Sequence, residues 1–378
     1  MLRILLTGGG SGGHIYPLIA VSEELRNIAG RNNIALDIRY CGAPGSFGGI
    51  LVSNNIEVRK IIGSKWRRYF DFRNFLDIPK FFLGVIQAIV RVFVLMPDVL
   101  FSKGGPGSFP VVFACWFYRI PIFIHESDTV LGISNALASR FARWIGLAFD
   151  SAENLFTVKG AVVAVVGNPI RQSLFAAREE QGILKKMLGF RDTLPLILVM
   201  GSSQGAQRIN EFVLDAAPLL TNSFQILHQT GLQNFDLIKQ EAVDVMKDAP
   251  PEERARYQLV PYLHKNYPDA IFAADIIVSR ASSSSIFEIA ASAKPSILIP
   301  LPEAAGDHQR MNAYEYSKTG AAVVVENENL TPHVFETQVR QLIANPDRLR
   351  AMSDAARGFA KPDAARLIAE AMILEMKR

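Results

Sequence analysis

The sequence predicts an α/β protein made of two domains, each a doubly wound parallel sheet covered by helices. Short apolar runs rich in β-branched residues alternate with helical patterns along most of the chain. The 378 residues are too many for one hydrophobic core of ordinary size. A strand, a small-residue loop and a helix follow one another at Gly8–His14 and again at Gly201–Ala206. The second half of the chain is therefore expected to repeat the architecture of the first.

The apolar runs place the strands, because each has the length of one buried strand and is bounded by polar or glycine-rich residues. In the first domain we expect strands at Leu2–Thr7, Ala35–Tyr40, Val58–Ile62, Val99–Ser102, Ile122–His125, Ile145–Phe149 and Val162–Val166. Near Gly167–Arg171 the chain leaves this sheet, because Pro169 disfavours regular structure. In the second domain we expect strands at Leu196–Met200, Gln225–His228, Gln258–Val260, Ile276–Ser279, Ser296–Pro300 and Ala322–Val325. The segment from about Pro332 to Arg378 has a helical pattern.

Composition narrows the functional class. Hydrophobic residues make up 49% of the chain and charged residues 20%, which is typical of a globular protein. The net charge of +4 is small, so we expect no nucleic-acid partner. Cys41 and Cys115 lie beside apolar runs without metal-ligand spacing, and we expect buried thiols in a reducing compartment. Because the first strand begins at Leu2, we expect no signal peptide and a cytoplasmic protein.

The loop Gly8–His14 is the most distinctive stretch, since it combines five glycines with one histidine between a strand and a helix. Backbone N–H groups at a helix start attract anions, and glycines let a phosphate approach the bare backbone. His14 is titratable near neutral pH, which favours chemistry as well as binding. The alternative is a tight turn in which the histidine only caps the helix.

Other strand ends carry polar or glycine-rich segments, and in a parallel sheet these ends lie at one edge. Lys103–Ser108 and His125–Asp128 follow two strands of the first domain, so one cleft is expected there. In the second domain Arg280–Ser285 precedes a helix expected at Ile286–Ser292, with Glu288 on its first turn. A helix cap is the alternative for this serine run. The segment Pro300–Asn312 is expected to be a loop whose last five residues, His308-Gln309-Arg310-Met311-Asn312, could reach a sugar.

A basic and aromatic stretch, residues 59–73, precedes a strongly apolar one, residues 75–96. The apolar stretch is too short to span a bilayer and is interrupted by Lys80, Gln87 and Arg91. A basic loop that leads into such a helix favours attachment to an anionic membrane surface. A buried helix preceded by a solvated loop is the alternative.

The loops GGGSGGHIYP, HESD, GNPIR, GSSQGAQRIN, SRASSSSIFEIA and DHQRMNA occur in the order and at the spacing of the MurG family. These bacterial glycosyltransferases add N-acetylglucosamine (GlcNAc) to the undecaprenyl-pyrophosphate-linked muramyl-pentapeptide called lipid I. The resemblance covers about residues 1–345 and implies the GT-B fold, in which two Rossmann-like domains face a cleft. It implies an acceptor and membrane-associating domain at 1–168, a UDP-sugar domain at 169–353, and a last helix, about 354–378, packed on the first domain.

The resemblance also implies the reaction, which is inverting, metal-independent transfer from UDP-GlcNAc to the C4 hydroxyl of lipid I in peptidoglycan synthesis. UDP-GlcNAc is then a substrate, and no cofactor is expected. The expected partners are UDP-GlcNAc, lipid I, the cytoplasmic membrane surface and other cell-wall synthesis proteins. The expected location is peripheral, on the cytoplasmic face of the cell membrane.

Roles for single residues follow from the matching motifs. His14 is the leading general base, and Glu126 is its rival because a pocket could raise its pKa. Donor-binding roles fall on Arg171, Ser203, Gln204, Leu263, Arg280, Ser284, Ser285, Glu288, His308 and Gln309. Acceptor or pyrophosphate-binding roles fall on Gly10, Ser11, Gly12, Gly13, Gly104, Gly105, Asp128 and Asn135. No residue is assigned to a metal.

Four departures from the family pattern affect these sites. Asp128 replaces the usual Asn, Pro106 replaces an aromatic residue, His308 replaces Gln, and serines occupy 282–285. A different UDP-sugar or lipid acceptor is therefore an alternative.

Two rival functions belong to other classes. Gly8, Gly10 and Gly13 fit the G-x-G-x-x-G pattern of a dinucleotide oxidoreductase, but its acidic partner should close the second strand, and Asp37 lies inside that strand. The other rival, a non-catalytic membrane-binding subunit, is disfavoured by the presence of His14, Glu288 and Gln309.

Overall fold

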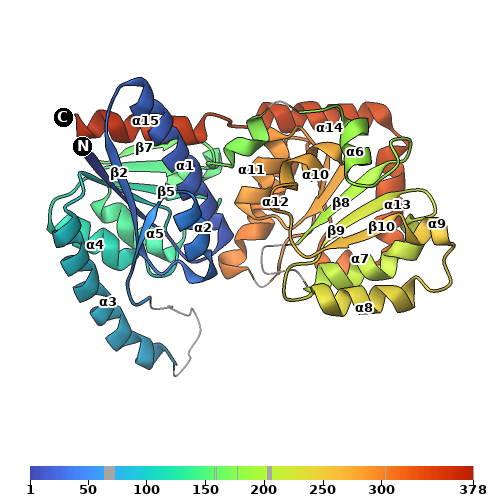
Figure 1. Ribbon diagram of the computed structural model, residues 1–378, viewed down its shortest axis with the longest axis horizontal. Coiled ribbons are helices and arrows are strands. Elements are labelled where there is room, and N and C mark those ends of the chain that lie inside the picture. The colour runs from blue at the N-terminus through green and yellow to red at the C-terminus, as the bar shows by residue number, and fades with distance from the viewer. Residues whose placement is uncertain are drawn as a thin grey trace. The chain divides into compact units, whose positions relative to one another are not determined.

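The computed structural model describes residues 1–63, 73–156, 158, 160–176, 178–201, 207–302 and 304–377, with the side chains of 73–78 and 305 outside that description (Figure 1). The chain divides into two compact units. Unit 1 consists of residues 1–172 and 361–378, and unit 2 of residues 173–360. The sequence prediction placed the boundary four residues earlier, after 168, and the return to the first domain at about 354. Each unit is described by itself.

Unit 1 is built on a parallel sheet with the strand order β3-β2-β1-β4-β5-β6-β7. The strands are β1 (Leu2–Thr7), β2 (Leu36–Gly42), β3 (Glu57–Lys60), β4 (Val99–Ser102), β5 (Ile122–Glu126), β6 (Trp144–Leu147) and β7 (Val162–Val165). In the central register, Ile4 of β1 pairs with Ile38 of β2 and with Val99 of β4. Every predicted strand is present, with its ends within two residues of the prediction.

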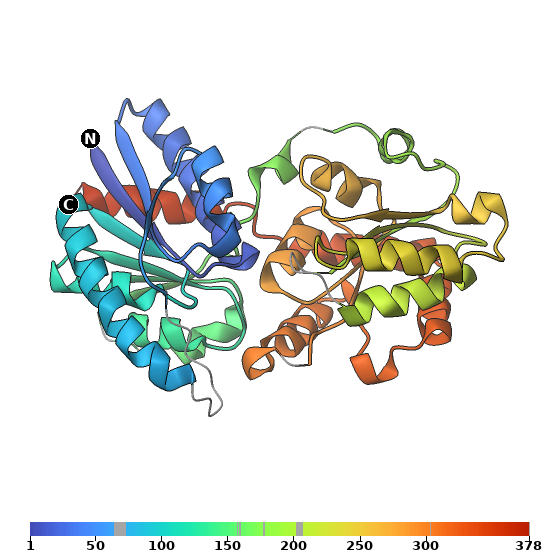
Figure 2. The same cartoon turned by 60° about the horizontal axis from the view of Figure 1, so that its bottom comes forward.

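Helices cover both faces of this sheet (Figures 1 and 2). Ile4 and Leu6 pack with α1 (Gly12–Arg31) and α15 (Ala364–Met376), whereas Leu5 between them belongs to the core on the other face. That face is covered by α3 (Arg73–Leu95), α4 (Phe109–Phe117) and α5 (Ile133–Ala138). The short α2 (Gly48–Ser53) precedes β3. The last helix, α15, packs against α1. The alternation of inward and outward residues along β1 therefore builds two cores from one strand.

Unit 2 repeats the plan with the strand order β10-β9-β8-β11-β12-β13, again parallel. Its strands are β8 (Leu196–Met200), β9 (Gln225–Gln229), β10 (Tyr257–Val260), β11 (Ile276–Ser279), β12 (Ser296–Leu298) and β13 (Ala322–Val324). Its helices are α6 (Gln181–Met187), α7 (Gln207–Leu220), α8 (Phe235–Val245), α9 (Pro251–Arg254), α10 (Tyr267–Ala273), α11 (Ser283–Ala291), α12 (His308–Ser317), α13 (Pro332–Ile343) and α14 (Pro346–Phe359). The predicted α/β class with two parallel-sheet domains is confirmed.

Two helix starts in unit 2 differ from the prediction. The helix expected from Ile286 begins at Ser283, because the Ser282 side chain accepts a hydrogen bond from the Ser285 N–H (3.3 Å) and caps it there. Glu288 therefore lies in the second turn of α11 and not in the first. The segment after Asp307, expected to be a loop, is the start of α12, and the preceding turn is made by Gly306 and Asp307, both at positive φ.

In unit 1, α3 covers the apolar stretch noted in the sequence. Its buried residues Ala88, Val92 and Leu95 recur at helical spacing and pack on the core. Large apolar side chains on its other side are exposed, and these are Phe82, Leu83, Ile86, Val90, Phe93 and Val94. Among the described residues, no helix is both long and apolar enough to cross a membrane. The basic and aromatic residues 64–72 lie outside the described part of the chain.

Candidate functional site

The loop between β1 and α1 places His14 in the first turn of a helix. Ser11 is the N-cap of α1, but its side chain makes no capping hydrogen bond. Its Oγ lies 2.7 Å from Nδ1 of His14 instead. The His14 N–H donates to the Ser11 carbonyl (3.1 Å), and Gly12 and Gly13 place backbone N–H groups at the helix start, where anions bind. The structure therefore brings the predicted residues of this loop together at the start of α1, with the imidazole of His14 beside them.

A second glycine turn, after β4, forms the other wall of this site. The Gly9 N–H donates to the Gly104 carbonyl (2.8 Å), which joins the two loops. Gly104 and Gly105 have φ of +74° and +87°, and a Cβ placed on Gly105 would lie 2.6 Å from Nε2 of His14. Only glycine combines this backbone conformation with room for the imidazole. The ring of His14 thus lies between two glycine loops.

The substitution Gly105→Ala is expected to reduce catalysis strongly. The positive φ costs about 1–3 kcal/mol for a residue with a Cβ, and the new methyl group displaces the His14 ring. A displacement of about 1 Å can cost on the order of 10²-fold in rate. Gly320→Ala is the matched control, because Gly320 has φ +88° and nothing within 4 Å of its Cβ position. Comparable losses of kcat in the two variants would contradict the assignment of Gly105.

Glu126, the predicted rival base, is held by the backbone. Its side chain is 4% exposed at the end of β5. Oε1 accepts from the N–H groups of Ser127 (2.9 Å) and Asp128 (3.3 Å), and Oε2 accepts from Gly132 N–H and Asn135 Nδ2 (3.0 Å each). Burial and the charge of Asp128 raise the pKa of Glu126, while these hydrogen bonds oppose the shift. The geometry suits a carboxylate that organises the loop after β5.

Sequence reasoning missed Lys103, which the structure places at the centre of unit 1's strand ends. It is 2% exposed and donates from Nζ to His125 Nδ1, Ser127 Oγ and Asn168 Oδ1. Burial lowers the pKa of Lys103 to about 7, and attraction to Glu126 and Asp128 opposes the shift. The only sequence signal was its place next to Gly104-Gly105. The polar cluster predicted at these strand ends thus exists, with a lysine at its centre.

Arg171, expected near the donor phosphates, lies in unit 1 beside α1. Its guanidinium stacks on the ring of Tyr16, with Cζ 4.0 Å from the ring centroid. Tyr16 is two residues beyond His14 on α1. A cation is therefore held close to the first turns of the helix that carries the anion site.

In unit 2, the strand end of β11 leads into the serine turn of α11. Ser284 and Ser285 lie in its first turn, and Ser285 Oγ is 2.8 Å from Ser282 Oγ. Glu288 is 5% exposed and accepts a hydrogen bond from the hydroxyl of Tyr267, at the start of α10. Tyr267 was not singled out in the sequence, since it is 21 residues away. The Glu288 carboxylate, oriented by the Tyr267 hydroxyl, thus lies one helical turn after the N-terminus of α11.

Three other predicted donor residues of unit 2 make hydrogen bonds within that unit. Arg280 is buried and donates from Nη1 to the carbonyls of Ile299 and Pro300 (3.2 Å each), so it links the ends of β11 and β12. The Leu263 N–H donates to Gln229 Oε1 (3.0 Å). Gln309 Oε1 accepts from the N–H of Leu301 (3.1 Å), which leaves its amide nitrogen to donate. Gln309 and its neighbour His308 begin α12. Ser203 and Gln204 lie outside the described residues.

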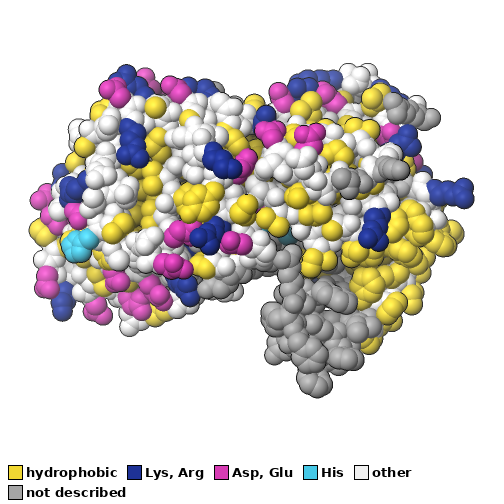
Figure 3. Space-filling model, turned by 180° about the vertical axis from the view of Figure 1, so that it is seen from behind, with side chains coloured by type: hydrophobic (Ala, Val, Ile, Leu, Met, Phe, Trp, Pro, Cys, Tyr) yellow, Lys and Arg dark blue, Asp and Glu magenta, His cyan; other side chains and the backbone are white. Residues whose placement is uncertain are grey.

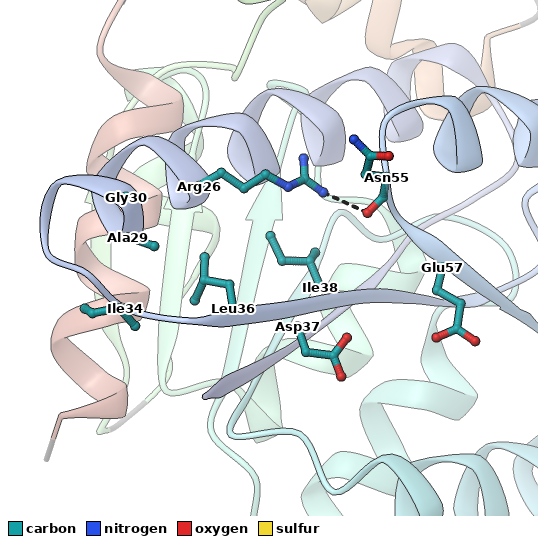
Figure 4. A pocket seen from close by; sticks show the side chains of 9 residues that line it. All are labelled: Arg26, Ala29, Gly30, Ile34, Leu36, Asp37, Ile38, Asn55 and Glu57. Atoms are coloured by element: carbon teal, nitrogen blue, oxygen red, sulfur yellow. Dashed lines mark hydrogen bonds between the residues drawn. The ribbon is translucent and has the colours of Figure 1, made fainter.

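A pocket of about 440 Å³ in unit 1 lies at the other end of the sheet (Figure 4). Asp37 lines it at the amino end of β2, and Arg26 of α1 reaches across to the carbonyl of Asn55 (2.9 Å). The acidic residue of a dinucleotide site would have to stand at the carboxyl end of β2. That end is Tyr40-Cys41-Gly42, which contains no acidic residue, and the Tyr40 hydroxyl donates to the Gly8 carbonyl (2.7 Å). The geometry therefore disfavours the dinucleotide alternative.

Comparison with known proteins shows the family of this chain. Residues 4–146 match the family model of the glycosyltransferase family 28 N-terminal domain, and residues 196–368 that of its C-terminal domain. A UDP-N-acetylglucosamine–N-acetylmuramyl-(pentapeptide) pyrophosphoryl-undecaprenol N-acetylglucosamine transferase of Bacillus cereus is 36% identical over 348 residues, covering 91% of this chain and 92% of the relative. The chain belongs to the MurG family of glycosyltransferases.

A second relative supports the same assignment, and solved structures share the fold. The MurG-family transferase of Halothermothrix orenii is 33% identical over 365 residues, covering 96% of this chain and 95% of the relative. The crystal structure of Acinetobacter baumannii MurG matches with a TM-score of 0.72 and 25% identity, covering 99% of this chain and 100% of that one. A UDP-GlcNAc 2-epimerase from Neisseria meningitidis, at 14% identity and a TM-score of 0.69, shares the fold over 99% of this chain and 100% of the other. The resemblance predicted from the loop motifs is confirmed at the level of the family.

Proposed function

We propose that this protein transfers GlcNAc from UDP-GlcNAc to the C4 hydroxyl of undecaprenyl-pyrophosphoryl-MurNAc-pentapeptide, with inversion at the anomeric carbon. The observation that carries the proposal is the His14 site, in which an imidazole lies between two glycine loops at a helix N-terminus. Membership of the MurG family, whose relatives are named for this reaction, supports the choice of substrates.

His14 is the proposed general base. Its Nδ1 faces Ser11 Oγ, and when Nδ1 carries the proton and donates it to that hydroxyl, Nε2 presents its lone pair. The acceptor C4 hydroxyl then gives its proton to Nε2 as its oxygen bonds to the anomeric carbon. The bond between that carbon and the UDP oxygen breaks on the opposite face. Glu126 is less suited to this role, because each of its oxygens already accepts two N–H groups.

Unit 2 is the proposed donor site. Glu288 can accept hydrogen bonds from both ribose hydroxyls, because a carboxylate has two acceptor oxygens. The first-turn N–H groups of α11 and the hydroxyls of Ser284 and Ser285 suit the diphosphate, whose negative charge grows as it leaves. Gln309, on the first turn of α12, is the proposed sugar contact.

Unit 1 is the proposed acceptor site. The glycines at 10, 12 and 13 and the start of α1 suit the pyrophosphate of a lipid-linked sugar. Gly104, Gly105 and Asn135 form the neighbouring wall, since Asn135 Nδ2 donates to the His125 carbonyl (3.0 Å) and its side chain packs on Gly104.

A transfer assay tests this function directly. Purified protein is incubated with UDP-GlcNAc and a short-chain lipid I analogue, and the disaccharide product and UDP are quantified. Other UDP-sugars and an analogue blocked at C4 are run in parallel. We expect transfer from UDP-GlcNAc and none to the blocked analogue. A rate of transfer from another UDP-sugar equal to that from UDP-GlcNAc would contradict the assignment of the donor. No transfer from any donor would contradict the proposed function.

We further propose that unit 1 binds peripherally to an anionic membrane surface through the exposed side of α3 and the end of α4. The apolar residues there include Phe93 (62% exposed) and Val94 (73%) on α3, and Trp116 and Phe117 on α4. Figure 3 shows a large group of hydrophobic side chains on one face of unit 1, with a few basic side chains near it. An exposed apolar patch with cations beside it suits a lipid surface on which the acceptor resides.

The double substitution Ile86→Glu with Phe93→Glu is expected to weaken binding to anionic vesicles at least 10-fold, since each large apolar side chain contributes roughly 1.5–3 kcal/mol when buried. Sedimentation with vesicles of phosphatidylglycerol measures the change. The control is Leu237→Glu with Val243→Glu on α8, whose side chains are 55% and 70% exposed. Equal loss in both double variants would show that charge alone weakens binding, against the proposed surface.

A further inference from the structure

Lys103 is a buried cation of unit 1 that the proposed reaction does not use. It directly follows β4, and its Nζ lies 2.5 Å from His125 Nδ1 and 2.8 Å from Asn168 Oδ1, with Ser127 Oγ as a third partner. His125 belongs to β5, Ser127 follows β5, and Asn168 follows β7. One side chain therefore joins the carboxyl ends of three strands.

The neighbours determine the direction of these hydrogen bonds. His125 Nε2 lies 2.8 Å from the carbonyl oxygen of Gly167, which can only accept. Nε2 therefore carries the ring proton, and Nδ1 turns its lone pair towards Lys103. Asn168 Oδ1 also only accepts. An ammonium group, with three donors and no acceptor, suits this set of partners.

Two carboxyl groups face this cation, one of them at an unusual position. Burial lowers the pKa of Lys103. Attraction to the carboxyl group of Glu126, and to a smaller extent to that of Asp128, opposes this shift. The sequence resemblance predicts Asn at position 128, where this chain has Asp. The additional negative charge is thus met by a buried positive charge in the same chain.

The lysine also adjoins the wall of the His14 site. Its backbone N–H donates to the Thr7 carbonyl (2.9 Å), and the next residue, Gly104, accepts from the Gly9 N–H (2.8 Å). Gly105 follows and lies against the His14 ring. The Lys103 segment is therefore hydrogen-bonded to the residues before the first glycine loop and continues directly into the second.

We propose that Lys103 is a positioning residue of the acceptor site and that Asp128 is its charge partner. The ammonium holds the Gly104-Gly105 turn against His14 by joining the three strand ends. It also offsets the negative charge of Glu126 and Asp128 beside the place where an acceptor pyrophosphate binds. This inference rests on the proposed acceptor role of unit 1.

The titratable groups that face Lys103 are His125 and Glu126 from β5 and Asp128 from the loop that follows, with His14 of α1 across the Gly105 turn. Burial and the charge of Lys103 keep the pKa of His125 well below its ordinary value, so this ring stays neutral. Loss of the lysine proton therefore leaves two carboxylates with no cation between them. An anionic acceptor binds such a site less well.

The test is a kinetic comparison of wild type, Lys103→Met, Asp128→Asn and the double variant, with lipid I analogue and UDP-GlcNAc varied in turn at several pH values. In wild type, the acceptor KM is expected to rise as the pH passes upward through about 7. In Lys103→Met it is expected to be roughly 10- to 100-fold higher than in wild type below pH 7, with a smaller difference above that pH and the KM for UDP-GlcNAc unchanged. Asp128→Asn removes a carboxylate that raises the lysine pKa, so the rise moves to lower pH. The double variant should recover part of the loss.

Lys294→Met is the matched control. Lys294 is a buried lysine of unit 2 that donates to the carbonyls of Phe272 (2.8 Å) and Ala274 (2.7 Å), and burial lowers its pKa to about 8. Its loss is expected to lower the melting temperature and leave the acceptor KM unchanged. If Lys103→Met does not fold, the inference is still tested by Asp128→Asn, in which the rise of the acceptor KM should move to lower pH.

An unchanged acceptor KM in Lys103→Met, or an unshifted pH profile in Asp128→Asn, would overturn the inference. A wild-type protein that transfers no sugar would instead overturn the proposed function.

Discussion

His14→Ala is expected to lower kcat by about 10²- to 10⁴-fold, the range that a positioned general base contributes. The donor residues are assigned to unit 2, so the KM for UDP-GlcNAc should change little. Added imidazole should restore part of the rate, because the glycine loops on either side of the removed ring leave space for it. Initial-rate measurements of disaccharide formation with and without imidazole check both expectations.

His333→Ala is the control for this variant, since the His333 side chain on α13 is 83% exposed. The variant Glu126→Gln tests whether Glu126, the rival candidate, is the general base. An amide nitrogen there would face N–H donors, so we expect a loss of about 1–3 kcal/mol in unfolding free energy with catalysis retained by the folded fraction. A His14→Ala enzyme that works at the wild-type rate, together with an inactive but stable Glu126→Gln enzyme, would reverse the assignment.

Glu288→Gln is expected to weaken UDP-GlcNAc binding roughly 10- to 100-fold, because hydrogen bonds to a charged group contribute about 1.5–3 kcal/mol. Calorimetric titration with UDP measures this without turnover. Tyr267→Phe should shift affinity in the same direction by less, because it removes only the hydroxyl that orients the carboxylate.

Glu252→Gln on α9, whose side chain is 60% exposed, controls for the loss of one negative charge in unit 2. UDP affinity in Glu288→Gln equal to that of this control would remove Glu288 from the donor site.

Strands were the most predictable part of the fold. β1, β4, β8 and β11 begin and end where the apolar runs do, because a buried parallel strand needs apolar residues on both faces. Helix starts were less predictable. The serine run before Ile286 resembles a loop in composition, yet Ser282 caps a helix there by accepting a hydrogen bond from the Ser285 N–H. Whether a serine caps a helix depends on backbone geometry that composition does not specify.

The candidate site divides in the same way. His14, the glycine loops, Glu288 and Gln309 could be found from local motifs, because a phosphate cradle or a helix start is made by neighbours in sequence. Glu126 could not be distinguished from a base, since its four N–H donors come partly from Gly132 and Asn135. Lys103 could not be found, because its partners include Asn168, 65 residues away.

The sequence by itself determined the α/β class, the repeat of two parallel-sheet units, the family and the histidine in the first glycine loop. Each of these depends on spacing along the chain, which strand and helix periods convert directly into structure. The tertiary structure alone decided which polar groups are engaged within the fold: Glu126 by backbone N–H groups, Arg280 by carbonyls, and Lys103 by three strand ends. The physical reason is that burial and hydrogen bonding depend on partners brought together only when the sheet forms.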